Sequence, residues 1–358
     1  MTDKIHRYPC PGCGAELVFE PREGALACPH CGRREEIPAS AEQVKARAWE
    51  DYLRTRPEQL GRLADGALEI QCAGCGAAVI FTPPTVALRC AFCGADVVAQ
   101  PRTADPVLAP GAVLPFHVSR EQATAAVKQW LASRWLAPSA LARMARNDAL
   151  GGVYLPFWSY DAYTVSHYTG QRGEHYWEEE RFTDRDGQVR TRQVQRTQWF
   201  PAAGSVTRWF ESVLVAGTRA LDATRLTALE PWDLAQLKPY EPAYLAGFGA
   251  QRAQVEVPEA FEQAKARMAE TIAGDVRRAI GGDVQQIDHV TTAYSAITFT
   301  HVLLPVWVSA YRFEGKVYQL LVNARTGEVQ GERPWSVVKL GLVVLLVVAL
   351  VLLIAVLV

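Results

Sequence analysis

A single uncharged run constrains this chain more than any other feature. The last nineteen residues, from Leu340 to Val358, read LGLVVLLVVALVLLIAVLV and contain no charged, amide or hydroxyl side chain. As a helix the run would be ~28 Å long, which is close to the ~30 Å hydrocarbon core of a bilayer. A buried core helix is the alternative, but such helices are rarely apolar on every side. The run therefore predicts one transmembrane helix over 336–358.

The residues around this run predict an orientation. Arg333, Trp335 and Lys339 flank its N-terminal side and form a candidate membrane-anchor flank, because basic and interfacial aromatic residues favour the cytoplasmic boundary. The N-terminus leads straight into a cysteine motif without the apolar run of a signal peptide. We expect a tail-anchored protein with a single C-terminal span and its N-terminal body in the cytoplasm.

All eight cysteines lie before residue 94 and form four Cys-x-x-Cys pairs. The pairs are grouped two by two, with fourteen residues between the two pairs of each group, so the front of the chain is an internal repeat. The first group is Cys10, Cys13, Cys28 and Cys31, and the second is Cys72, Cys75, Cys90 and Cys93.

Four thiolates carried on two turns match the tetrahedral preference of Zn²⁺. We therefore predict two structural Zn²⁺ ions, each in a closed Cys₄ site that leaves no position for a substrate. Disulfides are the weaker alternative for a cytoplasmic body, and a redox pair would stand alone beside a βαβ unit. His30 lies inside one pair, but with four sulfurs available we interpret it as a surface residue.

The rest of the chain divides by composition. We predict a zinc ribbon at 1–40, a helical spacer at 41–66, a second zinc ribbon at 67–102, a linker at 103–112 and a body at 113–335. A partner-binding role is the alternative for the spacer.

In the body, a strand, a helix and a strand with the pattern Leu-Pro-x-Trp occur in that order twice, ending at Leu155–Trp158 and Leu304–Trp307. The predicted fold class is α+β: two N-terminal β zinc ribbons, a duplicated α/β body with mainly antiparallel sheet, and one C-terminal transmembrane helix.

A polar insertion in the body predicts a long hairpin over 170–200. It carries several arginines and glutamates around the turn residues Asp184 to Gly187. A solvated ribbon with weak cross-strand ion pairs is one interpretation of this pattern. An arm that binds a partner is the other.

Charge and motifs narrow the function classes. The net charge of −1 exerts no general attraction toward nucleic acid, and the two ribbons are nearly neutral. Walker A, HExxH, GxSxG and GxGxxG motifs are absent. We interpret His167, His175, His289 and His301 as sheet residues, and we expect the chain not to be an enzyme.

Several segments together resemble one bacterial family. They are the double Cys-Pro-x-Cys-Gly ribbon, the Leu-Pro-Phe-Trp segment, Glu230-Pro-Trp-Asp, Leu245-Ala-Gly-Phe and the stretch from Val322 to Pro334. Members of that family are described as zinc-ribbon proteins of the transcription-factor-B type or as "primosomal protein N′ (replication factor Y)-like". The chain lacks the nucleotide-binding loop of a helicase.

The resemblance implies a place in the bacterial cytoplasmic membrane, in company with flotillin-like (SPFH) proteins and the phage-shock membrane-stress system. We thus expect a membrane adaptor that recruits protein partners through its ribbons and body. A nucleic-acid-binding protein of the replication or transcription type is the alternative. The sequence does not say whether a small molecule binds.

Overall fold

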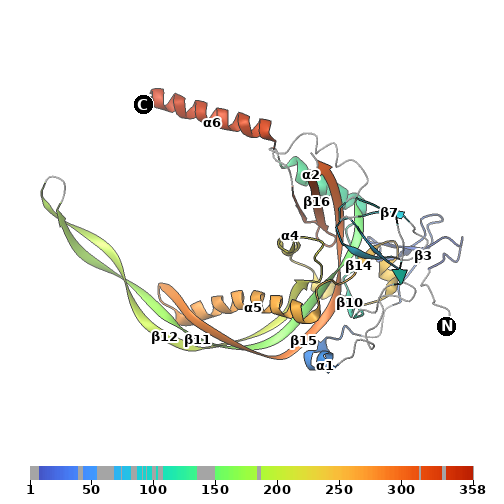
Figure 1. The fold of residues 1–358 in the computed structure, drawn as a ribbon, viewed down its shortest axis with the longest axis horizontal. Coiled ribbons are helices and arrows are strands. Elements are labelled where there is room, and N and C mark those ends of the chain that lie inside the picture. Colours follow the sequence, from blue (N-terminus) through green and yellow to red (C-terminus); the bar gives the residue numbers. More distant parts are fainter. Residues whose placement is uncertain are drawn as a thin grey trace.

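Three long strands dominate the fold: β11 (Gly151–Thr183), β12 (Val189–Ala216) and β15 (Val284–Phe313). The computed structural model describes residues 8–38, 43–54, 68–73, 75–81, 87–90, 92–93, 95–98, 102–103, 108–134, 150–183, 187–313, 316–332 and 336–357. β11 lies between β12 and β15 and pairs antiparallel with both. Together the three strands form a curved arm that extends well away from the rest of the protein (Figure 1).

The other elements are short apart from three helices. The N-terminal part contains β1 (Val18–Glu20), β2 (Ala25–Ala27), β3 (Arg34–Glu35), β4 (Arg47–Ala48), α1 (Trp49–Arg54), β5 (Leu68–Gln71), β6 (Ala78–Phe81), β7 (Ala87–Arg89), β8 (Asp96–Val98) and β9 (Arg102–Thr103). The remainder contains β10 (Ala112–Val113), α2 (Arg120–Ala132), α4 (Ala223–Ala228), η2 (Leu234–Gln236), β13 (Lys238–Pro239), η3 (Pro242–Leu245), β14 (Gly249–Gln251), α5 (Val257–Ile280), β16 (Lys316–Asn323), β17 (Val329–Gly331) and α6 (Val337–Leu357).

One 12-stranded sheet joins most of these strands. Its main path runs β13-β10-β15-β11-β14-β6-β5-β9, with β12, β16, β17 and β4 attached beside it. The second cysteine group therefore belongs partly to the main sheet, because β5 and β6 continue it through β14. The first group carries a separate three-stranded sheet, β1-β2-β3.

α5 covers one face of the arm where the three strands leave the body. Its apolar residues recur every three or four positions, as Phe261, Ala264, Met268, Ile272 and Val276, and all are buried. They pack in one cluster with strand residues such as Tyr160, Tyr168 and Phe210. Neighbouring strand residues alternate in direction, so the opposite face of the same strands is left open.

The two Leu-Pro-x-Trp segments lie side by side in the sheet. Leu155 pairs with Leu304 in antiparallel register. On the outside of this pair, β14 runs parallel to β11 at Val153, and β10 runs parallel to β15 at the corresponding Val302. The arrangement has the symmetry of two equivalent units related by a local two-fold rotation.

Equivalent hydrogen bonds complete this symmetry. The Trp158 indole N–H donates to the Val255 carbonyl at 2.8 Å, and that of Trp307 donates to the Val118 carbonyl at 2.8 Å. Each acceptor stands immediately before the N-cap residue of a helix, α5 or α2. The two tryptophans of the repeated motif thus hold the starts of the two corresponding helices.

Bulges bend the arm at its root. The register shifts on both sides of β11 near Asp161, where Ser212 and Ala296 have positive φ angles of 54° and 49°. The Asp161 carboxylate accepts hydrogen bonds from the Ser212 N–H at 2.7 Å and from the Thr298 hydroxyl at 3.1 Å. One side chain therefore stabilises both bulges, and the strands bend there over α5.

The predicted α+β class is wrong. The insertion predicted over 170–200 is the distal part of strands that begin in the core, so the body is mainly β and its helices cover the sheet in only a few places. The sequence did not indicate that β12 continues to Ala216, because the residues on its open face alternate between short polar and apolar side chains. The strand expected immediately before the second helix of the repeated order is not found: β14 ends at Gln251, and residues 252–256 lead into α5 without forming a strand.

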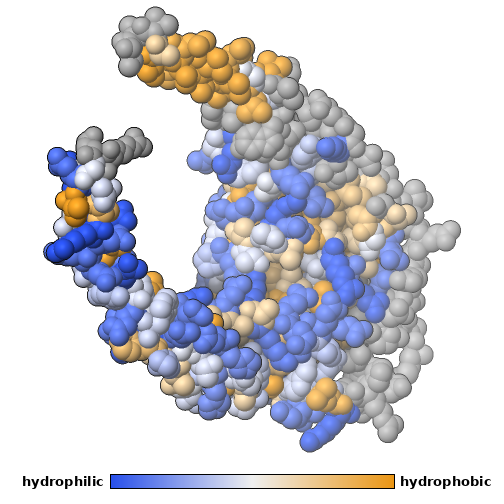
Figure 2. All heavy atoms as spheres, turned by 60° about the vertical axis from the view of Figure 1, so that its left-hand side comes forward, coloured by the Kyte–Doolittle hydropathy of each residue, from blue (hydrophilic) through white to orange (hydrophobic). Residues whose placement is uncertain are grey.

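The predicted transmembrane helix is also corrected. α6 is apolar and projects from the body (Figures 1 and 2). Within the described part of the chain, no helix is both long and apolar enough to cross a membrane. This finding overturns the predicted single C-terminal span over 336–358 and the localisation in the bacterial cytoplasmic membrane that depended on it.

Some predictions fall outside the described residues. They are the Arg333 and Trp335 members of the membrane-anchor flank, most of the helical spacer at 41–66 and the turn residues Asp184 and Asp186. Lys339, the third flanking residue, lies in the first turn of α6, where its backbone N–H donates to the Ser336 hydroxyl at 3.3 Å.

Candidate metal centres and the exposed face of the arm

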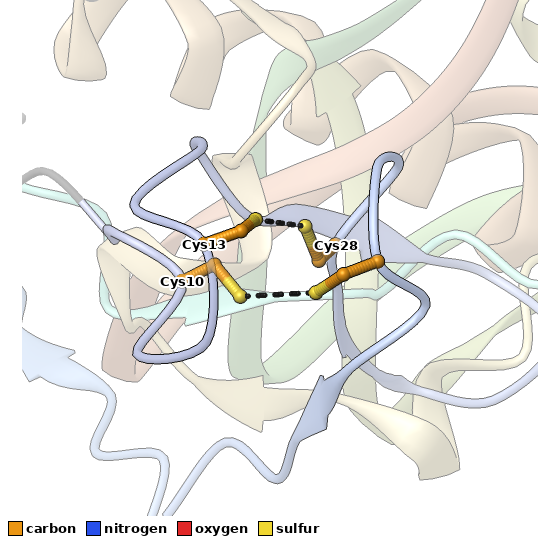
Figure 3. A group of neighbouring side chains, drawn as sticks. Cys10, Cys13 and Cys28 are labelled. Atoms are coloured by element: carbon orange, nitrogen blue, oxygen red, sulfur yellow. Dashed lines mark hydrogen bonds between the residues drawn. The ribbon is translucent and has the colours of Figure 1, made fainter.

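The eight cysteines form two separate clusters of four, in the groups that the spacing predicts. Within each cluster the four Sγ atoms lie within 4.8 Å of one another. Cys10 and Cys31 are 3.5 Å apart at sulfur, as are Cys13 and Cys28 (Figure 3). The corresponding distances in the second cluster are 3.5 Å for Cys72–Cys93 and 3.7 Å for Cys75–Cys90.

These distances fit a metal better than a disulfide. A disulfide joins its sulfurs at ~2.05 Å. A regular tetrahedron with metal–sulfur bonds of ~2.3 Å has edges of ~3.8 Å, which is close to the separations in both clusters. The donor set is therefore compatible with two metal ions, held by Cys10, Cys13, Cys28 and Cys31 and by Cys72, Cys75, Cys90 and Cys93.

The local backbone explains why the sulfurs converge. In the first three turns a glycine follows the second cysteine and has a positive φ, 73° at Gly14, 71° at Gly32 and 73° at Gly76. Each of these glycines donates its N–H to the carbonyl of the first cysteine, as from Gly14 to Cys10 at 2.8 Å. Such a turn needs left-handed backbone, which glycine adopts without steric cost.

Backbone N–H groups also act on the sulfurs. The N–H groups of Cys31 and His30 lower the pKa of the Cys28 thiol to about 6. In the second cluster, burial raises the pKa of the Cys90 thiol to about 11. A cation bound among the four sulfurs would favour the thiolate form of all of them.

A second feature is the face of the arm that points away from α5, which we call the outer face. Its residues alternate along the strands with those that pack on α5. Four large aromatic side chains on it are exposed: Trp177 at 65%, Trp209 at 48%, Trp199 at 43% and Tyr163 at 37%. Tyr163 and Trp209 lie directly opposite each other in the β11–β12 ladder.

On β11 and β12 the outer face is free of charged side chains over a long distance, whereas on β15 Asp288 lies beside Gln286, the cross-strand partner of Gln171. On β11 the uncharged part runs from Tyr163 to Trp177, about 46 Å at 3.3 Å per residue. The residues on it between those two are Val165, His167, Thr169, Gln171, Gly173 and His175, paired with Thr207, Ser205, Ala203, Pro201, Trp199 and Thr197 of β12. Charges gather instead on the other face near the tip, where Arg192 and Arg196 pair with Glu180 and Glu178.

The four β-strand histidines have different environments. His167, His175 and His289 are exposed on the arm. His301 is buried, donates from Nδ1 to the Leu108 carbonyl at 2.8 Å and packs against Trp158. Burial lowers the pKa of His301 to about 4. The structure does not bring the four together.

A cavity of about 350 Å³ lies beneath the root of the arm, bordered by Phe210, Trp232 and Arg267. The Arg267 guanidinium donates to the Leu214 carbonyl at 2.5 Å and to the Glu230 carboxylate at 3.0 Å. Through these hydrogen bonds the Arg267 guanidinium connects α5 to β12 and to the loop after α4, so we assign it a structural role.

Fold and site together define a protein with two Cys₄ clusters on a mainly β body that carries a long β arm. The chain is 28% identical to a Bacillus subtilis (strain 168) protein with the description "Uncharacterized protein YdjG", across 93% of this chain and 91% of that protein. No protein-family model matches the chain, and no solved structure matches it. The matched length is far greater than that of the body alone, and the description of the relative states no activity.

The sequence missed the outer face. It identified the hairpin as a candidate arm but did not indicate which side chains face solvent. One sequence pattern could have indicated this face. From Tyr163 to Trp177 every second residue is uncharged, and some of these residues are aromatic.

Proposed function

We propose that this chain is an adaptor that docks a protein partner on the outer face of the arm, with two structural zinc ions that stabilise its ribbons. The exposed aromatic side chains on the part of the outer face that β11 and β12 form, which has no charged side chain from Tyr163 to Trp177, carry this proposal. Interface centres are depleted in charge and enriched in tryptophan and tyrosine, and such residues contribute most of the binding free energy. A long uncharged surface with Tyr163, Trp199 and Trp209 has that composition.

Zinc is the proposed metal because four thiolates in a tetrahedron are its preferred structural site. A four-thiolate site is closed, so its role is to fold the ribbon. The ribbons stand beside the body: Phe19 of the first donates its N–H to the Ala246 carbonyl at 2.9 Å, and β6 of the second pairs with β14.

The resemblance to the family with flotillin-like company suggests the first partner to test. The full chain would be co-expressed with an SPFH protein from its own genome and purified by a tag on the SPFH protein. We expect Tyr163→Ala combined with Trp209→Ala to lower recovery at least tenfold. Phe182→Ala is the matched control, because Phe182 is also an exposed aromatic residue of the arm but lies on the other face.

Equal recovery of the control and the double variant would place the contact elsewhere. Recovery of neither the wild type nor any variant would reject the flotillin-like partner.

A nucleic-acid-binding protein is the alternative function. It requires clustered Lys and Arg and an affinity that falls steeply with salt. On β11 and β12 the outer face has no charged residue between Tyr163 and Trp177, and near the tip Arg192 and Arg196 are paired with glutamates. We expect no salt-dependent binding of a labelled 20-mer DNA duplex or single strand in fluorescence anisotropy between 50 and 200 mM salt, the range over which phosphate contacts weaken by roughly 10³–10⁵.

A further inference from the structure

The two cysteine clusters differ in their access to solvent. In the first cluster Cys13 and Cys31 are exposed. None of the four cysteines of the second cluster is exposed: two are buried, and Cys75 and Cys93 are half-buried. The susceptibility of a cysteine to oxidation rises with its exposure. A reagent dissolved in water therefore reaches two sulfurs of the first cluster directly, whereas the second cluster is more enclosed.

The residues beside the cysteines explain this difference. His30 and Phe92 occupy equivalent positions, directly before the last cysteine of each cluster. Phe92 is fully buried in a core cluster of the body, and its carbonyl accepts a hydrogen bond from the Gln319 amide at 2.6 Å. His30 is exposed, as are all residues of the two turns of the first cluster, 11–14 and 29–34. The second cluster is thus packed into the body, and the first faces solvent.

The two ribbons are also joined to the body in different ways. In the second ribbon, β5 and β6 belong to the 12-stranded sheet, and the buried Glu69 of β5 forms an ion pair with Arg252 at 2.9 Å. The first ribbon keeps a three-stranded sheet of its own. It packs on the body through side chains such as Phe19, whose ring centroid lies 5.5 Å from that of Tyr244. The first ribbon can therefore open without breaking the main sheet.

Each exposed sulfur of the first cluster has a buried sulfur within reach. The Cys31 Sγ lies 3.5 Å from that of Cys10, and the Cys13 Sγ lies 3.5 Å from that of Cys28 (Figure 3). Cys10 and Cys28 are the buried members of these pairs. A disulfide needs ~2.05 Å between its sulfurs, so a movement of about 1.5 Å closes either pair. An oxidant that attacks the exposed sulfur therefore leaves a second sulfur in place to complete a disulfide.

We propose that the first cysteine cluster is a modification site for peroxides and that the second cluster resists the same reaction. The inference rests on the zinc content proposed above but not on the docking role of the arm. Two thiolate sulfurs lose two electrons and form one S–S bond, Cys31 with Cys10 or Cys13 with Cys28. The O–O bond of hydrogen peroxide breaks, and its two oxygens accept these electrons and two protons from solvent and leave as hydroxide and water in equilibrium with two water molecules.

Formation of one disulfide changes the first ribbon only. It removes two of the four thiolate ligands, and the thiolate is the form of cysteine that binds zinc. The first site therefore releases its ion, and a small ribbon that depends on a metal opens without it. Opening separates Phe19 from Tyr244 and leaves β5 and β6 in the main sheet. A disulfide is reversible, so a thiol reductant and Zn²⁺ restore the closed ribbon.

Peroxide treatment of the full chain tests the site. The zinc content is measured first, and hydrogen peroxide is then added together with a dye that changes absorbance when it binds zinc. We expect one ion per chain to be released at least tenfold faster than the other, and dithiothreitol with added Zn²⁺ to restore it. Release of both ions at one rate overturns the proposal, as does retention of both under conditions that oxidise free glutathione. A protein without zinc before treatment rejects the metal assignment, and this inference with it.

Differential alkylation identifies the oxidised cysteines. After peroxide treatment the remaining thiols are blocked in denaturant with iodoacetamide, the disulfides are reduced and labelled with N-ethylmaleimide, and mass spectrometry locates the label. We expect the label at the four cysteines of the first cluster and not at those of the second. Label at the second cluster to the same extent overturns the proposal.

Two variants provide a matched comparison of the clusters. Cys72→Ser keeps the first cluster, so its remaining zinc ion should leave at the fast rate. Cys10→Ser keeps the second cluster, and its remaining ion should leave at the slow rate. Equal rates in the two variants overturn the proposal. The labelling of the wild-type chain decides the assignment even where a variant does not fold.

Discussion

At the scale of single residues, Trp158 and Trp307 of the repeated motif make equivalent hydrogen bonds. Each indole N–H holds the carbonyl that precedes a helix, and the Trp158 bond is the more deeply buried of the two. Removing one partner of a buried hydrogen bond leaves the other unsatisfied, at a cost of about 1–3 kcal/mol. We expect Trp158→Phe to lower the free energy of unfolding by about 2 kcal/mol and Trp307→Phe by less. Denaturant unfolding of the two variants and of the exposed control Trp209→Phe measures this.

His301 makes stability depend on pH. Burial lowers its pKa from 6.5 to about 4, so the folded protein holds the ring neutral where the unfolded chain would protonate it. The contribution of the neutral His301 to the free energy of unfolding is therefore fully present above pH ~6.5. It decreases as the pH drops from ~6.5 to ~4. The full loss is about 3 kcal/mol at about 1.4 kcal/mol per pKa unit. His301→Gln, which can still donate to the Leu108 carbonyl, should remove this slope. An unchanged slope in denaturant unfolding at pH 7, 6 and 5 would exclude His301 as its origin.

At the scale of elements, α5 is the main support of the arm's root. Met268 and Ile272 are fully buried between it and the strands. Truncating such a side chain removes apolar contacts and leaves a cavity, which costs about 2–5 kcal/mol. We expect Met268→Ala to destabilise the protein by that amount in denaturant unfolding, and Glu270→Ala, on the solvent side of the same helix, to have little effect. Similar losses from both variants would mean that α5 does not depend on its buried face.

The two cysteine clusters determine the metal content that we expect for the protein. Two Cys₄ clusters predict two zinc ions per chain in elemental analysis of the purified protein. Cys72→Ser removes one ligand of the second cluster and should lower the content to about one ion per chain. Because β5 and β6 belong to the main sheet through β14, it should also raise the protease sensitivity of the neighbouring Glu69–Arg252 region. Cys10→Ser should remove the other ion without that effect. A content that stays at two in either variant would contradict the assigned ligands.

The elements also show what the sequence could predict. The two helices expected in the repeated order are present as α2 and α5, and the cysteine spacing specifies both clusters because each turn is local. The lengths of β11, β12 and β15 could not be predicted. Their bend depends on Asp161 contacting Ser212 and Thr298, which are distant in sequence. An alternation of Thr, Ser, Gln and Ala does not distinguish a long exposed strand from a loop.

At the scale of the whole molecule, the distal arm makes few contacts with the body. β15 stops pairing with β11 at Gly173, so beyond it β11 and β12 contact mainly each other. Near this point the His175 N–H donates to the Asp283 carboxylate at 2.7 Å, which ties the arm to the start of β15. A two-stranded ribbon of this kind has little stability of its own and adds little to the core. The distal arm is therefore not needed to hold the body together.

Shortening the arm tests this separation. Replacing residues 177–195 with Asn-Gly joins Tyr176 to Arg196, which are cross-strand partners, by a two-residue hairpin turn. The free energy of unfolding should change by less than about 1 kcal/mol, because the ion pairs removed, such as Arg192–Glu180, are exposed. A large loss of stability would instead show that the arm supports the body.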